Sequence, residues 1–476
     1  MRKTKIVCTL GPASASEKTI EAMLRAGMNV ARLNFSHGTH KSHLKYIETF
    51  RKVRDKMGLP AAVMLDTKGP EIRIGTFPDG KIELEDGKPF TLSALPCDGS
   101  AERVFVNYAD LPSKLKAGNV LLLDDGKIAL RVDEVEGAEI RCTVDHGGLL
   151  RDRKSLNVPG VALDMVYLSE ADKADILFGI ENDVDFISAS FVRSKKDVSD
   201  LRKFLDYNGG HDIKIIAKIE NSEGIENFDE ILEAANGIMI ARGDMGVEVP
   251  FERLPGIQKR FIRRCYQAGK MVITATQMLE SMVHNSTPTR AEITDVANAV
   301  FDGTSAVMLS AESAMGDFPV EAVKTMATIA EQAEHDAFEM DVYRGISHDV
   351  AARETTNAIC DAAAKAAHDM DARAIIAVTM HGHTARRMSK FRPAQPIIAA
   401  TPLIKTFHQL SLSWGVYPVI ARFITSSDEL FVHAVDCAKQ LDMVEDGDRV
   451  VITSGIPLET SASTNLMRIQ VVGERF

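Results

Sequence analysis

Apolar runs alternate with amphipathic segments over most of the chain, and their spacing predicts which segments are strands and which are helices. The expected strands of the two long alternating stretches are 4–9, 29–34, 61–66, 185–190, 213–218, 237–242, 271–276 and 305–310; the expected helices are 17–26, 41–57, 169–180, 195–207, 224–234, 251–268, 289–301 and 318–335. Eight strand–helix units are the number that closes a (β/α)8 barrel. The pattern therefore predicts an α/β protein with a barrel built from residues 1–70 and 166–344.

The segment between the two halves of this barrel has a different pattern. Between residues 71 and 165, short alternating runs at 81–84, 120–123 and 139–144 are separated by Asp-Gly and Gly-rich turns, and helical spacing is almost absent. This pattern predicts a small all-β domain inserted after the third barrel strand.

Residues 345–476 return to alternating helices and apolar strands. The expected strands are 374–379, 396–400, 417–421, 449–454 and 466–472. This number of elements is enough for a separate C-terminal open α/β domain.

Composition limits the partners. The 476 residues allow about three domains. The net charge of -11 disfavours binding to nucleic acid or anionic membranes through bulk charge. No apolar run approaches the roughly 20 residues needed to cross a bilayer, and the six cysteines are scattered, as is typical of reduced thiols. We therefore expect a cytoplasmic protein without a membrane or nucleic-acid partner.

Polar residues gather where the expected barrel strands end, which is where the active site of a barrel lies. They are Arg32, Asn34, Ser36 and His37 after the second strand, Asp66, Thr67, Glu71 and Arg73 after the third, Lys218 and Glu220 after the fifth, Gly243 and Asp244 after the sixth, and Thr276 after the seventh. One rim would thus collect cations, carboxylates and small hydroxyl groups.

Two of these carboxylates predict a metal site. Glu220 and Asp244 follow adjacent strands, and Mg²⁺ is commonly held by one or two carboxylates together with substrate phosphates. The alternative is that each carboxylate pairs with Lys218 or Arg242 in a structural ion network.

Two arginines of the rim suit the binding of phosphate or carboxylate. Arg32 and Arg73 can bind such groups through two parallel N–H donors, and the alternative is a salt bridge to Asp66 or Glu71. The chain has no P-loop, Rossmann, nucleophile-elbow or H-E-x-x-H motif. A rim that holds Mg²⁺, phosphate oxygens and a small anion together provides what phosphoryl transfer needs.

Several long motifs resemble pyruvate kinase. They are NVARLNFSHG at 29–38, LDTKGPEIR at 65–73, IIAKIENSEG at 215–224, ARGDMG at 241–246, ATQMLES at 275–281 and PTRAE at 288–292. The resemblance covers the whole chain in order, including the β insertion and the C-terminal domain. It implies transfer of the phosphoryl group of phosphoenolpyruvate to ADP, giving ATP and pyruvate, by a homotetramer.

The resemblance also implies roles at the substrate. Glu220 and Asp244 would bind Mg²⁺ or Mn²⁺, and Lys218 would stabilise charge on the transferring group and on the enolate. Thr276, with the backbone of Gly243 and Asp244, would seat the substrate carboxylate. Thr276 would also belong to the chain that delivers the proton, whose ultimate donor stays open.

The nucleotide and a monovalent cation complete the implied site. Arg32 and Arg73 would hold phosphates, and Asn34, His37 and Arg73 would lie by the nucleotide. The family's K⁺ site corresponds to Asn34, Ser36, Asp66 and Thr67, whose ligands are all oxygen atoms. Glu71 is the residue found in K⁺-dependent members, so we expect K⁺ activation, although Ile74 stands where such members often carry Thr.

By the same resemblance, the β insertion is a lid hinged near Pro70 and Pro159, and the C-terminal domain binds a phosphorylated effector. The effector candidates are Thr379, His381, Gly382, His383, Thr384, Ser461, Ser463 and Thr464. Histidines stand where Ser, Lys or Arg are frequent, so the effector stays open between a sugar phosphate and AMP. Protonated histidines would make effector affinity rise as the pH falls through ~6.5.

Two other functions compete with this interpretation. An aldolase or mutase acting on phosphoenolpyruvate would share the Mg²⁺ and enolate chemistry, but it needs no ADP site, lid or effector domain. A catalytically silent metabolite sensor would be expected to have lost Lys218 or Glu220, and both are present.

Overall fold

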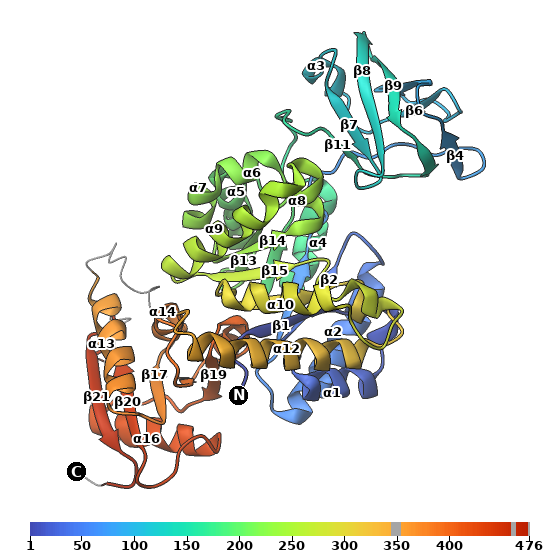
Figure 1. Ribbon diagram of the computed structural model, residues 1–476. Coiled ribbons are helices and arrows are strands. Elements are labelled where there is room, and N and C mark those ends of the chain that lie inside the picture. The colour runs from blue at the N-terminus through green and yellow to red at the C-terminus, as the bar shows by residue number, and fades with distance from the viewer. Residues whose placement is uncertain (344–353, 458–462, 475–476) are drawn as a thin grey trace.

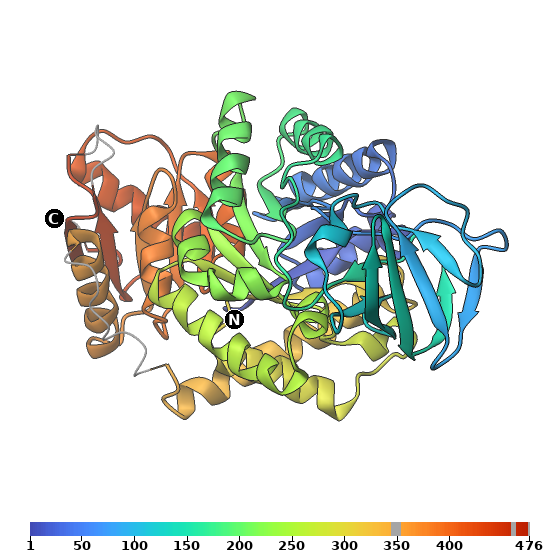
Figure 2. The same cartoon turned by 90° about the horizontal axis from the view of Figure 1, so that it is seen from above.

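Eight parallel strands close a barrel in the middle of the molecule, with the β-rich segment on one side and the C-terminal sheet on the other (Figures 1 and 2). The computed structural model describes residues 1–343, 354–457 and 463–474. In order around the barrel, the strands are β1 (Lys5–Thr9), β2 (Val30–Asn34), β3 (Ala62–Asp66), β12 (Phe186–Ala189), β13 (Lys214–Ile219), β14 (Gly237–Ala241), β15 (Met271–Ala275) and β16 (Ala306–Leu309), which pairs with β1. The expected (β/α)8 barrel is confirmed.

Helices cover the outside of the barrel. They are α1 (Glu17–Ala26), α2 (His40–Met57), α4 (Glu170–Glu181), α5 (Lys195–Tyr207), α6 (Ser222–Glu226), α7 (Phe228–Ala234), α8 (Arg242–Glu248), α9 (Leu254–Gln267), α10 (Arg290–Phe301), α11 (Ala311–Ala314) and α12 (Pro319–Glu339). The ends of α1 show how the sequence sets their limits. The Ser16 hydroxyl accepts a hydrogen bond from the Thr19 N–H at its start, and Gly27 ends it with a φ of 117°.

The inside of the barrel is an apolar core. Its side chains include Val7, Val30, Met64, Phe186, Met239, Ile273 and Met308, and Leu412 of the 3-10 turn η4 (Leu410–Leu412) belongs to the same cluster. This packing leaves the chemistry to the carboxyl ends of the strands.

The β-rich segment is confirmed as an insertion after β3. Its strands are β4 (Lys81–Leu84), β5 (Pro89–Ser93), β6 (Arg103–Phe105), β7 (Val120–Leu123), β8 (Ile128–Glu136), β9 (Glu139–His146), β10 (Gly148–Arg151) and β11 (Leu156–Asn157). β11, β7, β8, β9, β5 and β6 form one sheet in that order, and β10 pairs with β4. Its apolar cluster, which includes Phe90, Leu121 and Leu130, is separate from that of the barrel. One short helix, α3 (Leu111–Lys114), interrupts the expected all-β pattern.

The C-terminal sheet is open, as expected. Its order is β19 (Val416–Ile420), β18 (Ile397–Thr401), β17 (Ala374–Val378), β20 (Arg449–Ser454) and β21 (Leu466–Val471), and only β21 runs antiparallel to its neighbour. The helices of this part are α13 (Thr355–Asp369), α14 (His383–Lys390), α15 (Ile404–Gln409) and α16 (Ser427–Gln440).

The structure corrects two of the expected helices and adds a further one, α8. The helix expected at 224–234 is broken at Asn227, whose side-chain amide donates to the Arg193 carbonyl at 2.9 Å. The helix expected at 251–268 begins at Leu254, after the 3-10 turn η2 (Phe251–Arg253), with a proline in its first turn. The sequence did not predict α8, because its glycines favour a turn.

The amino-terminal end of the barrel is fastened to the C-terminal sheet. The first residues are held by the barrel's own helix α12, where the buried Glu334 carboxylate accepts the backbone N–H groups of Lys3 and Thr4 at 2.8 and 2.5 Å. The Lys5 ammonium donates to the Val416 carbonyl at 2.7 Å, and burial lowers its pKa to about 7. From α15, the Gln409 side-chain amide donates to barrel carbonyls, including that of Asp212 at 2.7 Å. These contacts lie at the opposite end of the strands from the polar rim.

A buried histidine in α15 predicts acid sensitivity. Burial, with the nearby charge of Arg54, lowers the pKa of His408 to about 4, against ~6.5 in an unfolded chain. The unfolded state therefore takes up this proton first, and stability is lost as the pH falls from about 6.5 towards 4. We expect His408→Gln to remove about 1–2 kcal/mol of the acid-induced loss between pH 7.5 and 5, measured by urea unfolding. The matched control, His368→Gln at an exposed position, is expected to follow the wild type, and a curve for His408→Gln parallel to wild type would contradict the prediction.

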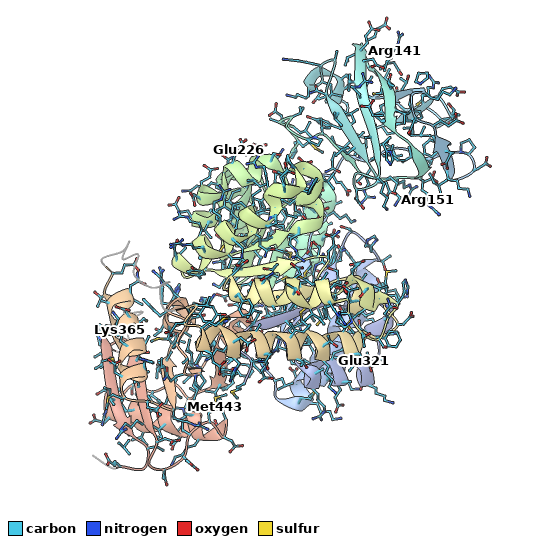
Figure 3. All side chains as sticks on the ribbon, viewed as in Figure 1. Arg141, Arg151, Glu226, Glu321, Lys365 and Met443 are labelled. Carbon is cyan, nitrogen blue, oxygen red and sulfur yellow. The ribbon has the colours of Figure 1, made fainter. Side chains whose placement is uncertain are left out.

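Charged side chains such as Arg141, Glu226 and Lys365 lie on the outer surface of the three parts (Figure 3). No helix in the described residues is both long enough and apolar enough to span a membrane. The six cysteines, all within the described ranges, are unpaired thiols, and five of them are buried.

Candidate active site

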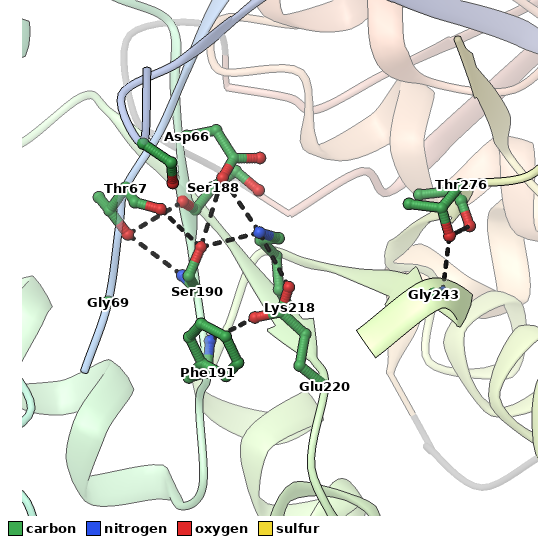
Figure 4. Close-up of polar contacts among 12 residues, drawn as sticks. Asp66, Thr67, Gly69, Ser188, Ser190, Phe191, Lys218, Glu220, Gly243 and Thr276 are labelled. Atoms are coloured by element: carbon green, nitrogen blue, oxygen red, sulfur yellow. Dashed lines mark hydrogen bonds and ion pairs between the residues drawn. The ribbon is translucent and has the colours of Figure 1, made fainter. Parts of the chain in front are cut away.

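The carboxyl ends of the barrel strands bring several of the expected polar residues to one rim, among them Asp66, Lys218 and Glu220 (Figure 4). Asn34 of β2 pairs in register with Asp66 of β3, and Asp66 pairs with Ser188 of β12. Because the strands are parallel and in register, residues that are far apart in the chain end at one height. Lys218 on β13 thereby reaches Asp66, which lies 152 positions earlier in the chain.

Asp66 pairs with two cations of the rim, Arg32 and Lys218. Its Oδ2 accepts from Arg32 Nε at 2.7 Å, and its Oδ1 lies 3.1 Å from Lys218 Nζ. Arg32 also donates to the Thr9 hydroxyl at 2.9 Å. Burial raises the pKa of the Asp66 carboxyl, but Arg32 and Lys218 together hold it below its usual value. The alternative of a salt bridge between Arg32 and Asp66 is therefore present in the structure.

Glu220 is the second carboxylate around Lys218. Its Oε1 lies 2.9 Å from Lys218 Nζ, and its Oε2 accepts the Phe191 N–H at 2.6 Å. Glu220 is only 1% exposed, and burial raises its pKa, with Asp244 adding to the rise and Lys218 opposing it. Two carboxylates near each other in a site of low solvent access are the donor set that a divalent cation prefers.

Asp244 lies in the first turn of α8 and is half-buried. Within the described chain, no Lys or Arg pairs with its carboxylate, whereas Arg242 pairs with Asp295 at 2.7 Å. The structural ion network considered from the sequence thus forms at Glu220 through Lys218, but does not extend to Asp244 through Arg242.

Thr276 and Gly243 meet as expected. The Thr276 Oγ1 accepts the Gly243 N–H at 2.8 Å and donates to the Ala275 carbonyl at 2.6 Å. Thr276 and Gln277 both have positive φ values, 68° and 54°, and the Arg242 guanidinium donates to both of their carbonyls, at 2.6 and 3.1 Å. Such values are uncommon for residues other than glycine, and they turn the Thr276 hydroxyl towards α8.

Arg73 lies apart from the Lys218 cluster, at the start of the β-rich segment. It pairs with Glu71 at 2.7 Å and donates to the Arg153 carbonyl at 2.8 Å, and its side chain is 43% exposed. Burial raises the pKa of Glu71, and Arg73 opposes that rise. The salt bridge considered for Arg73 is therefore formed.

The expected monovalent-cation residues are only partly assembled. Asp66 and Thr67 are buried, and Asn34 accepts the Ser36 N–H through its side-chain oxygen at 3.1 Å. The side chains of Ser36 and His37 lie on an exposed turn beyond β2.

Sequence reasoning missed Ser190 and Phe191, which follow β12 and contact Lys218 and Glu220. The position of Ser190 at the end of the fourth expected strand was an available signal, because the active site of a barrel lies at such strand ends. The sequence does not show which hydrogen bonds a serine at such a position makes. The contact between Ser190 and Lys218 could therefore be identified only from the structure.

The C-terminal part contains a cavity of about 610 Å³ next to the expected effector loop. The effector candidates that line it are Thr379, His381, His383, Thr384, Ser463 and Thr464, and the backbone N–H of Gly382 donates to the Thr379 hydroxyl at 3.0 Å. Thr384 and Thr464 are joined by a hydrogen bond of 2.7 Å between their hydroxyls. The expected Ser461 lies outside the described residues.

The expected protonation of His383 is corrected by its surroundings. Partial burial, with the positive charges of Arg386 and Lys214, lowers the pKa of His383 to about 4. The ring is therefore neutral in the mildly acid range and supplies no charge for an anionic effector near pH 6.5.

Comparison with known proteins identifies the family. The model described as pyruvate kinase, barrel domain, matches residues 1–323, and the pyruvate kinase alpha/beta domain matches residues 357–470. The chain is 47% identical to the pyruvate kinase of Clostridium acetobutylicum, over 99% of this chain and 100% of that protein. It is 48% identical to the pyruvate kinase of Geobacillus stearothermophilus, over 99% of this chain and 81% of that protein. A crystal structure of a pyruvate kinase from Cryptosporidium parvum matches with a TM-score of 0.93 and 39% identity, over 99% of this chain and 96% of that one. The chain belongs to the pyruvate kinase family.

Proposed function

We propose that this phosphotransferase transfers the phosphoryl group of phosphoenolpyruvate to ADP at the rim around Lys218. The observation that carries the location is the Lys218 ammonium, which is buried 3.1 Å from Asp66 and 2.9 Å from Glu220. A fixed ammonium beside Glu220, whose carboxylate can take a metal ion, suits an anionic group that enters with a divalent cation.

Glu220 and Asp244 would hold Mg²⁺ or Mn²⁺. The donor set fits, because both ligands are hard oxygens and their mutual repulsion contributes to the raised pKa of Glu220. When bound, the ion neutralises negative charge on the substrate oxygens.

The chain's own residues would orient the substrate and stabilise developing charge. As the bond between the enol oxygen and phosphorus breaks and a bond to the ADP oxygen forms, Lys218 stabilises charge on the phosphoryl group and then on the enolate. Arg32 binds phosphate, and Thr276 with the backbone of Gly243 and Asp244 seats the carboxylate. The enolate carbon then takes a proton through a chain that includes the Thr276 hydroxyl.

Arg73, His37 and Asn34 would bind the nucleotide, which the exposure of Arg73 and His37 permits. Asn34, Ser36, Asp66 and Thr67 would hold K⁺, with Ser36 moving towards the others when the ion binds. The cation would offset the charge of the substrate phosphate.

The β-rich segment, residues 71–165, would act as a lid that closes over the rim. Support comes from its separate core and from its contact with α8, where the Asn157 side-chain amide donates to Glu248 at 3.1 Å. Closure would exclude water, which competes with ADP for the phosphoryl group. Hinges near Pro70 and Pro159 would join it to a barrel of residues 1–70 and 166–344.

Residues 345–476 would bind a phosphorylated effector in the 610 Å³ cavity, with Thr379, Thr384 and Thr464 as donors. The effector would be a sugar phosphate or AMP, and the working enzyme would be a homotetramer.

We expect pyruvate formation from phosphoenolpyruvate to require ADP and Mg²⁺ and to be several-fold faster in K⁺ than in Na⁺ or Tris salts. The measurement couples pyruvate to NADH oxidation by a dehydrogenase, with AMP or a sugar phosphate added in parallel samples. Equal rates in all three salts would contradict the cation site at Asp66 and Thr67 but leave the reaction in place. An unchanged rate with every effector would contradict the regulatory role of the cavity.

A further inference from the structure

The turn that follows β12 contacts both groups at the centre of the rim. Ser190 and Phe191 lie between the end of β3 and the end of β13, and Figure 4 shows their hydrogen bonds to Lys218, Glu220 and Thr67. The Ser190–Phe191 turn lies outside the sequence motifs of the rim, and those motifs assign it no role.

Ser190 completes the hydrogen bonding of the Lys218 ammonium. Lys218 Nζ lies 2.8 Å from Ser190 Oγ, 3.1 Å from Asp66 Oδ1 and 2.9 Å from Glu220 Oε1. An ammonium has three N–H donors, and these three acceptors match them in number. Ser190 Oγ can accept from Lys218 because its own hydrogen has a partner in the Thr67 carbonyl, 2.6 Å away.

Phe191 contacts Glu220, the carboxylate that pairs with Lys218. Its N–H donates to Glu220 Oε2 at 2.6 Å, and this direction requires a φ of 52°, which L-residues rarely adopt. Gly69 packs against the same turn, since a Cβ at residue 69 would come within 2.9 Å of Ser190 Cβ and 3.0 Å of the Ser190 carbonyl oxygen. The Thr67 hydroxyl also accepts the Ser190 N–H at 3.1 Å. The surrounding segment therefore fixes an uncommon backbone conformation.

We propose that the Ser190–Phe191 turn is a positioning element for the reaction: Ser190 Oγ orients the Lys218 ammonium and the Phe191 N–H orients the Glu220 carboxylate. This inference rests on the proposed roles of Lys218 and Glu220. Neither residue of the turn would touch substrate, so both act through the residues that they orient. Misplacement of Lys218 costs transition-state stabilisation more than substrate binding, so the effect falls on kcat.

The same strand provides a matched control. Ser188 is fully buried two residues earlier, and within the described chain its hydroxyl has no hydrogen-bond partner. Ser188→Ala and Ser190→Ala therefore remove the same atom from two buried positions two residues apart, but only the second breaks a contact with Lys218.

We expect Ser190→Ala to lower kcat about 10–100-fold, with KM for phosphoenolpyruvate changed by less than about threefold. Ser188→Ala is expected to keep kcat within about twofold. Ser190→Cys, which preserves volume but offers a weak acceptor, should lose turnover as the alanine variant does and covers the case in which the latter does not fold. Equal kcat values for the Ser188 and Ser190 variants would overturn the proposal.

A double-mutant cycle separates positioning from general support of the fold. In a Lys218→Met background, adding Ser190→Ala is expected to change the residual rate by less than about threefold, because the group it orients is gone. A loss as large as that in the wild-type background would assign Ser190 to the fold alone and overturn the proposal. If the wild type shows no turnover, or Lys218→Met turns over at the wild-type rate, the proposed role of Lys218 fails and the proposal for the turn falls with it, an outcome that differs from a loss of the Ser190 effect alone.

Discussion

Replacement of Lys218 by methionine is expected to lower kcat by about 10³-fold or more, because it removes the ammonium that stabilises the transferring phosphoryl group and the enolate. Burial alone would lower the pKa of Lys218, but Asp66, Glu220 and Asp244 together hold it above its usual value, so the group stays charged throughout the range of any practical assay. Methionine has a similar length and is unbranched, which keeps the packing comparable. The measurement is kcat at saturating phosphoenolpyruvate, ADP and Mg²⁺.

The control for this variant is a lysine on the outer surface of the barrel. Lys203→Met changes the same residue type on α5, where the side chain is 78% exposed, and should leave kcat within about threefold of wild type. Circular dichroism and thermal melting establish that both variants are folded. Turnover by Lys218→Met within tenfold of wild type would remove Lys218 from the mechanism.

Glu220→Gln is expected to raise the Mg²⁺ concentration needed for half-maximal activity by about 100-fold or more and to lower kcat as well. Substitution of a residue that only hydrogen-bonds to a metal ligand lowers metal affinity about 10–100-fold, so substitution of a ligand itself should lower it further. The neutral amide also removes a negative charge from beside Lys218, 2.9 Å away. The measurement is a titration of activity with Mg²⁺ and Mn²⁺, together with direct binding of Mn²⁺ followed by electron paramagnetic resonance.

Glu226→Gln provides the comparison for Glu220, since Glu226 is an exposed carboxylate at the end of the neighbouring helix α6. Its Mg²⁺ dependence should match that of wild type. An unchanged Mn²⁺ affinity in Glu220→Gln would show that the metal is bound elsewhere and would redirect attention to other carboxylates of the rim.

The fold could be predicted from the sequence where periodicity was strong. β1 to β3 and their helices agree with the expected ranges to within one residue, because buried parallel strands are short β-branched runs and the helices have clear caps such as Ser16 and Gly27. The predicted helix boundaries were wrong at Asn227, where a side-chain hydrogen bond interrupts the helix. They were also wrong at α8, where residues that include two glycines form a helix despite their low helix propensity.

The site could be predicted as a set of residues but not as a set of contacts. The strand ends placed Asp66, Lys218 and Glu220 on one rim because parallel strands share an end. Spacing alone could not say that Asp66 binds both Arg32 and Lys218, or that Arg73 pairs with Glu71 away from them. Those choices depend on distances across neighbouring strands, and so did the contact of Ser190 with Lys218.

The pairing of β1 with β16 has a consequence for synthesis on the ribosome. Lys5 lies beside Ala306, so the barrel cannot close until residues 306–309 have been translated. Asp66 likewise waits for Lys218, 152 residues later, which takes about 8–30 s at typical rates of translation. During that interval the Asp66 carboxylate, which is buried in the folded protein, lacks one of its two cations. The residues that form the core of the β-rich segment are all translated within the same interval. The nascent chain is therefore expected to fold its inserted segment first and to assemble its catalytic rim only late in translation.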